Sequence, residues 1–167
     1  MLHTTLILLH ATFAVVAFGV GCALLVSLPT SLRSGRFIAY YISAWLAVIF
    51  LVTVVLVDWA ALPVLKRIAF GALCLLALYL LWRTDRARSC LVHRTGNWRK
   101  PFIGHVGFVL ISLFDGFCIV AAIDLHLAPV VIALVAVLGV AAGIVAIRYV
   151  VRREAGREAG ASAVGAG

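Results

Sequence analysis

The segment VGFVLISLFDGFCIVAAI, residues 106–123, is an apolar run with one charged side chain, Asp115. A run of about 18 or more apolar residues is long enough to cross the roughly 30 Å hydrocarbon core of a bilayer as an α-helix. Comparable runs recur along the chain, separated by short segments that are mostly basic. We therefore expect an all-α, polytopic transmembrane helix bundle with five spans, at about residues 4–28, 37–57, 60–82, 101–123 and 128–147.

The composition excludes a water-soluble fold. Hydrophobic residues make up 65% of the 167 residues, and the mean hydropathy is +1.20. Soluble domains are nearer 45–50% apolar, and a domain of about 150 residues buries only about 70% of its unfolded surface. The apolar runs are continuous rather than alternating, which argues against a membrane barrel. The organisation expected is a five-helix transmembrane domain, residues 1–151, and a low-complexity, disordered cytoplasmic tail, residues 152–167.

The basic residues predict the orientation. Twelve of the 14 Lys and Arg residues fall in the segments 33–36, 83–100 and 148–157, which share one side of a five-span model. That side should be cytoplasmic, which places the N-terminus outside and the C-terminus in the cytoplasm. The longest basic loop carries Arg83, Arg86, Arg88, Arg94, Arg99 and Lys100.

The net charge of +8 is explained by these loops and by their attraction to anionic lipid. The bilayer is therefore the expected partner, and nucleic acid is not. Arg far outnumbers Lys, and Ala, Gly and Val abound. This composition is typical of GC-rich bacterial genomes, so we expect a multi-pass protein of the inner (plasma) membrane.

Asp115 is the strongest functional signal, because a carboxylate near the bilayer centre costs about 2.5–3.5 kcal/mol on insertion scales. Such a group should face protein or water and have a partner. From the rise per residue, Asp115 shares the outer half of the membrane with His10, Lys66 and Arg67. Lys66 and Arg67 either lie inside the outer leaflet or extend their side chains to the headgroups.

Helical periodicity suggests which helices meet. Two stripes of small and polar residues occur at helical spacing: His105, Ser112, Asp115 and Gly116 on one helix, and His3, His10, Ala14, Ala17 and Gly21 on the other. Because such stripes mark helix contacts in membranes, we expect these helices to face each other with His10 near Asp115. Alternatively, each side chain has its own hydroxyl or carbonyl partner. A GxxxG motif, Gly139 to Gly143, indicates either internal packing or dimerisation.

These residues favour a small carrier, or a subunit of one, handling a proton or small polar ligand. Asp115 would be the proton acceptor or cation ligand, and His10 its titrating neighbour. Lys66 and Arg67 would complete the site, with Ser112 and His105 as a supporting polar stripe. No Ser/His/Asp set, phosphate-binding loop or acidic cluster for Mg²⁺ is evident in the sequence, so we expect no enzyme and name no catalytic residue.

Three other interpretations stay open. The chain could be an accessory or assembly subunit of a larger membrane complex, or a homo-oligomer. It could bind haem as a b-type or redox protein, although an axial offset of about 19 Å prevents His10 and His105 from sharing one iron. It could bind a metal at the outer mouth through His3, His126, Asp58 and Asp124, with His10 nearby. The four cysteines form no CxxC pair and predict no disulfide framework or thiol metal site.

Overall fold

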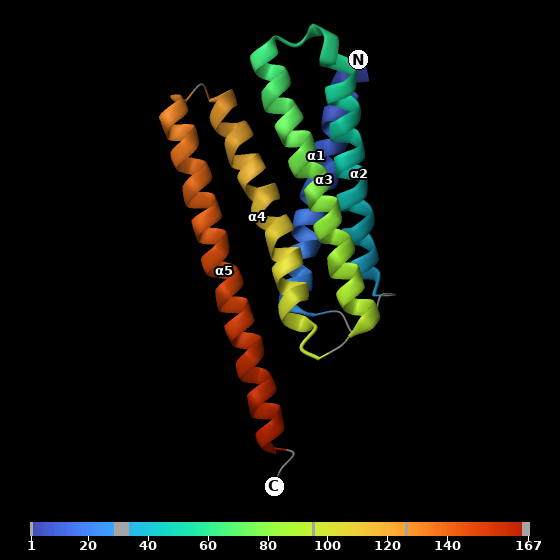
Figure 1. Cartoon of the computed structure of the whole chain (residues 1–167), viewed down its shortest axis with the longest axis vertical. Helices are drawn as coiled ribbons and strands as arrows, with labels where there is room; N and C mark the ends of the chain where they lie inside the picture. Colours follow the sequence, from blue (N-terminus) through green and yellow to red (C-terminus); the bar gives the residue numbers. More distant parts are fainter. Residues whose placement is uncertain (1, 29–33, 95, 126, 165–167) are drawn as a thin grey trace.

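The computed structural model describes residues 2–28, 34–94, 96–125 and 127–164, and these residues are helical with no strand. The elements are α1 (Leu2–Val26), α2 (Gly35–Asp58), the 3₁₀ turn η1 (Trp59–Ala61), α3 (Val64–His93), α4 (Arg99–Asp124) and α5 (Pro129–Val164). The long helices run alternately up and down, so the two termini lie at opposite ends (Figure 1). This confirms the expected all-α architecture.

The bundle has a basic end and an N-terminal end. The basic end holds the C-terminus and the α1–α2 and α3–α4 connections. The N-terminal end holds the N-terminus, η1 and the α4–α5 connection (Figure 1).

Within the described residues, four helical segments are long and apolar enough to cross a membrane: Leu2–Val26, Gly35–Ala61, Arg99–Ala122 and Ala133–Glu154. Exposed Leu, Ile and Val side chains occur on every long helix. In water such surfaces would be a liability, whereas lipid tails solvate them. The chain therefore has the helices of a multi-pass membrane protein.

α3 differs from its expected bounds of 60–82. The chain first forms η1, and α3 begins after Pro63, whose fixed φ of −59° suits a helix start. The helix then continues past Trp82 to His93, because residues 83–93 hold neither Gly nor Pro. It ends where Arg94 adopts a left-handed backbone, φ 39°, and donates its N–H to the Cys90 carbonyl. Much of the expected loop 83–100 is thus helix.

α5 also differs from expectation, because it continues to Val164 where the sequence predicts disorder from residue 152. Ala, Arg and Glu dominate this segment and are strong helix formers, so a helix already started by the preceding span propagates. Glu154 lies 3.8 Å from Arg99, which joins α5 to the first residue of α4.

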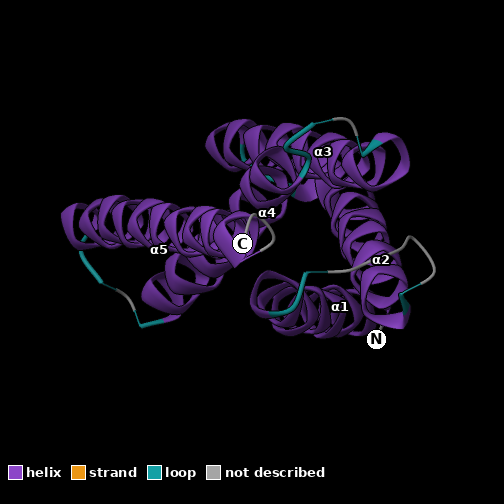
Figure 2. Cartoon of the chain, turned by 90° about the horizontal axis from the view of Figure 1, so that it is seen from below, coloured by secondary structure: helices purple, strands orange, loops and turns teal. Residues whose placement is uncertain are grey.

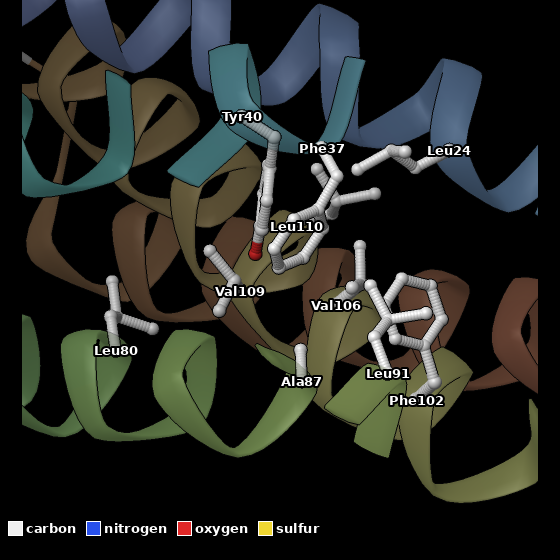
Figure 3. Close-up of a cluster of buried hydrophobic side chains, with 10 residues drawn as sticks. All are labelled: Leu24, Phe37, Tyr40, Leu80, Ala87, Leu91, Phe102, Val106, Val109 and Leu110. Atoms are coloured by element: carbon white, nitrogen blue, oxygen red, sulfur yellow. The ribbon is translucent and has the colours of Figure 1, made fainter. Parts of the chain in front are cut away.

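The core lies at the basic end, where α1, α2, α3 and α4 converge (Figure 3). Its buried members are Leu24, Phe37, Tyr40, Leu80, Ala87, Leu91, Phe102, Val106, Val109 and Leu110. The ring of Phe37 lies 6.4 Å from Tyr40 and 6.3 Å from Phe102, measured between centroids. Gly21 allows this convergence, because a Cβ there would lie 2.6 Å from Leu110 Cδ2 and 3.2 Å from the Tyr40 ring.

α5 contributes no side chain to the buried members of this core. Seen along the bundle, it lies outside the other helices, and its main neighbour is α4 (Figure 2). The most extensive helix pair is α1 with α2, where α1 buries Ala14, Ala17 and Gly21. The small residues of the stripe predicted on α1 are therefore buried, whereas its His3 is exposed and its His10 half-buried.

Candidate functional site

α4 and α5 pack through a regular ladder of glycines and larger side chains. Ile147 lies over Gly107, Ile111 over Gly143 and Asp115 over Gly139. Successive rungs step four residues forward along α4 and four residues back along α5, as two antiparallel helices require. The GxxxG motif of α5 is therefore used in packing within the chain, one of the two roles that the sequence allowed.

Asp115 is the polar rung of this ladder. Its Oδ1 occupies the place that a Cβ would take on Gly139, so the Gly139 Cα–H bond points at the carboxylate oxygen. Such C–H···O contacts recur at helix–helix interfaces and are weak. Oδ1 is buried, and among the described residues it has no hydrogen-bond partner. The half-buried carboxyl thus packs against α5, and no basic side chain pairs with it in the part of the chain that the structure describes.

His10 does not meet Asp115, so the sequence-based pairing is corrected. His10 Nδ1 lies 2.8 Å from the Ala47 carbonyl oxygen of α2. A carbonyl only accepts, so Nδ1 donates, and in the neutral ring Nε2 remains as an acceptor. This is the carbonyl partner that the sequence offered as the alternative.

The expectation that α1 and α4 face each other holds in part. These helices meet through Phe18 and Phe114, whose ring centroids are 6.2 Å apart, and through Gly21 and Leu110. All of these α1 residues are closer to the basic end than His10. The contact therefore brings different residues together from those predicted.

Arg67 donates to backbone carbonyls just before α3. Its Nε donates to the Leu62 carbonyl at 2.8 Å, and Nη2 donates to the Ala60 carbonyl at 3.0 Å. The guanidinium thus turns back to the turn at the N-terminal end, as a side chain extending to the headgroups would. The side chain of Lys66 lies outside the described part of the structure. The described side chains of the predicted site, His10, Arg67 and Asp115, do not form one cluster.

Among the described side chains of the proposed outer metal site, one pair lies in contact. His3 Nδ1 lies 2.5 Å from Asp58 Oδ2 at the N-terminal end. The described residues contain no group of three or more His, Cys, Asp or Glu side chains able to hold a metal ion. His126 and the side chain of Asp124 lie outside the described part. All four cysteines are free thiols.

The predicted polar stripe on α4 is divided between two places. Ser112 is half-buried, one turn from Asp115. His105 lies at the basic end, where its ring meets Trp82 edge-on with centroids 6.5 Å apart. His105 Nδ1 is buried and has no hydrogen-bond partner among the described residues. His10 and His105 thus lie towards opposite ends of the bundle, in keeping with the expectation that they cannot share one iron.

Arginines at the basic end lie over aromatic rings. The guanidinium carbons of Arg86 and Arg94 are 5.1 Å and 5.2 Å from the ring centres of Trp82 and Trp98. The other pairs are Arg83 with Phe108, Arg88 with Tyr41, and Arg99 with Trp98. Arg83 also donates to the Gly104 carbonyl at 2.8 Å, which ties α3 to α4. Stacking on rings holds these cations in defined positions.

A pocket of about 230 Å³ opens between α3 and the start of α4 at this end. Its lining residues are Arg86, Ser89, Cys90, His93, Arg94, Trp98, Pro101 and His105. This pocket could not be predicted from the sequence, because the apolar run of the third helix ends near Trp82. Once the helix continues, the spacing of Arg86, Cys90 and His93 places these three side chains on one face.

Comparison with known proteins finds no matching family model, no matching curated protein and no matching solved structure.

Proposed function

We propose that the chain is a small proton-coupled carrier, or the membrane subunit of one, in which Asp115 binds and releases a proton. The observation that carries this proposal is the buried Asp115 Oδ1, which packs on Gly139. No cation among the described side chains pairs with this oxygen, and removal from water then favours the neutral, protonated acid. Contact with water favours the ionised form, so access to water would control proton binding.

The two basic candidates whose side chains the structure describes, His10 and Arg67, have other partners. His10 donates to Ala47, and Arg67 donates to Ala60 and Leu62. Neither is placed to neutralise the carboxylate. α5 is the element best placed to uncover Asp115, because its main neighbour is α4. A small displacement of α5 would break the Gly139 contact without opening the core at the basic end.

The topology proposed with this function has five spans, with the N-terminus outside and the C-terminus in the cytoplasm of a bacterial cell. α3 runs beside the other helices between the two ends, in the direction that a fifth crossing requires (Figure 1). The segments with twelve of the 14 basic residues include the basic-end parts of α3 and α5 and the connections at that end. The positive-inside rule supports a cytoplasmic location for that end, and the plasma membrane is the proposed location.

Proton flux into liposomes tests the function. Purified protein would be reconstituted, a potassium diffusion potential applied, and internal acidification followed with a trapped pH-sensitive dye. We expect flux above that of empty liposomes for the native chain and background flux for Asp115→Asn, with unchanged helical content. The matched control is Asp58→Asn, which removes a carboxylate paired with His3 and should keep most of the flux. Native flux at the background level, or full flux in Asp115→Asn, would contradict the proposal.

A second candidate is an accessory subunit of a larger membrane complex. The position of α5 favours it, because most of the circumference of this helix is open to lipid or to another protein (Figure 2). In that case Asp115→Asn would reduce the amount of folded or assembled protein, and the native chain alone would carry no protons.

A further inference from the structure

The pocket at the basic end has the chemistry of an anion site. Its lining holds two arginines, Arg86 and Arg94, and two histidines, His93 and His105, and none of the lining residues is acidic. The hydroxyl of Ser89 and the thiol of Cys90 add two small polar groups. The two carboxylates described near this end are engaged elsewhere, since Asp85 accepts from Tyr41 at 2.7 Å and Glu154 pairs with Arg99.

Aromatic rings hold the cationic side chains of the pocket in position. The guanidinium of Arg86 lies over Trp82 and that of Arg94 over Trp98, and Trp98 itself lines the pocket. His105 is held edge-on to Trp82, and its buried Nδ1 has no hydrogen-bond partner among the described residues. Groups placed before binding lose less conformational entropy when a ligand arrives.

Size and position restrict the ligand. A volume of about 230 Å³ lies below the 300–1,000 Å³ typical of drug-sized ligands and suits a small anionic group. Tryptophans and arginines beside an apolar helix bundle are typical of the level of the lipid headgroups. Basic pockets at this level recognise phosphate-bearing headgroups through arginine, whose fork of N–H groups matches phosphate oxygens.

We propose that this pocket binds a phosphate group, and specifically the phosphate of an anionic phospholipid headgroup in the leaflet at the basic end. Arg86 and Arg94 bind the phosphate oxygens, and Trp98 forms the wall along which the glycerol enters. His105, whose Nδ1 is buried, supplies a further polar group to the lining. This site is separate from Asp115 and does not depend on proton transport.

Cys90 provides a direct probe of occupancy, because it lines the pocket and the other three cysteines do not. Burial raises the pKa of the Cys90 thiol, and the charge of Arg86 opposes part of this rise. Since only the thiolate reacts, an Arg86 variant changes the basal alkylation rate even without ligand. Protection is therefore expressed, for each variant, as the ratio of alkylation rates without and with the ligand.

The experiment uses the full chain with Cys22, Cys74 and Cys118 replaced by Ala, in nanodiscs. Alkylation of Cys90 by N-ethylmaleimide is compared in phosphatidylcholine, in phosphatidylcholine with phosphatidylglycerol, and in phosphatidylcholine with inorganic phosphate. We expect phosphatidylglycerol to protect Cys90, and the concentration for half protection to rise about tenfold in Arg86→Gln, as for the loss of one charge-assisted hydrogen bond.

Arg88→Gln is the matched control. It removes the same charge two residues away, but Arg88 lies over Tyr41 and does not line the pocket. It should leave protection unchanged. Arg94→Gln, which should also weaken protection, keeps the test informative if Arg86→Gln fails to fold by circular dichroism.

Each outcome decides the proposal. Protection by phosphatidylglycerol alone assigns the phosphate to a lipid, whereas protection by inorganic phosphate in phosphatidylcholine assigns the same site to a soluble phosphate compound. Equal alkylation rates under all three conditions would overturn the site. Equal weakening in Arg86→Gln and Arg88→Gln would also overturn it, because general surface charge would then explain the effect.

Discussion

The two halves of the bundle are built differently from the same helices. On α3, burial begins at Ala77, and the buried residues lie towards the basic end. None of the described residues of α3 before Ala77 is buried. On α4, the first part buries Phe102, Ile103, Val106, Val109 and Leu110, whereas residues 111–121 are only partly covered. Asp115 lies in that second, open part.

This difference separates the most tightly packed part of the fold from the proposed proton site. Local stability follows the density of buried contacts, so the basic half should hold the bundle together. The N-terminal half leaves helix faces to the lipid and carries the polar groups His10 and Asp115. A carrier needs such an arrangement, because a site that opens and closes cannot lie in the most tightly packed part of the fold.

The largest expected effect comes from replacing one phenylalanine in each half of α4 and comparing the two losses of stability. Phe102 is 0% exposed, within the core, whereas Phe114 is 45% exposed and stacks on Phe18. Phe102→Ala should lower the free energy of unfolding by about 3–5 kcal/mol, since it leaves a cavity. Phe114→Ala should lower it by about 1 kcal/mol, the value of an aromatic pair.

Unfolding in mixed micelles of increasing dodecyl sulfate content, followed by circular dichroism, measures both values. Similar losses for the two variants would mean that the N-terminal half is packed as tightly as the basic half. The comparison between the halves would then fail.

A smaller effect is expected from adding one methyl group on α1. A Cβ on Gly21 would meet Leu110 and Tyr40, whereas a Cβ on Gly19 would have no heavy atom within 4 Å. Gly21→Ala should therefore destabilise the protein by about 1–3 kcal/mol through overpacking. Gly19→Ala should be neutral or stabilising by up to about 1 kcal/mol, because Ala favours helix over Gly. The same unfolding titration checks both, and a harmless Gly21→Ala would show that the core adapts.

Much of the fold could be predicted from the sequence, because lipid demands long apolar helices. The first, second and fourth helices begin and end within about two residues of their predicted bounds. The third and fifth do not, since hydropathy marks where lipid ends and not where a helix ends. For α3, the positive φ values of Arg94 and Gly96 mark the turn, and the apolar run stops well before it.

The candidate site was harder to predict. The cost of an intramembrane carboxyl singled out Asp115, whose role as a site residue stays a prediction. Its neighbour could not be deduced, because periodicity defines a face of a helix but not which helix covers that face. His10 donates a hydrogen bond to the Ala47 carbonyl on α2, and Asp115 packs on Gly139 of α5. The pocket at the basic end stayed hidden because it needs the part of α3 beyond Trp82.

The smallest expected effect concerns the pair His3–Asp58 at the N-terminal end. The two side chains are 51% and 34% exposed, so solvent and salt screen their attraction despite the short separation. A double-mutant cycle with His3→Ala and Asp58→Ala should give a coupling free energy below about 1 kcal/mol, decreasing further in high salt. A coupling of about 2 kcal/mol or more that salt does not change would require a pair shielded from water. The N-terminal end would then be a second rigid centre, and Asp115 would lie between two fixed ends instead of in the open half.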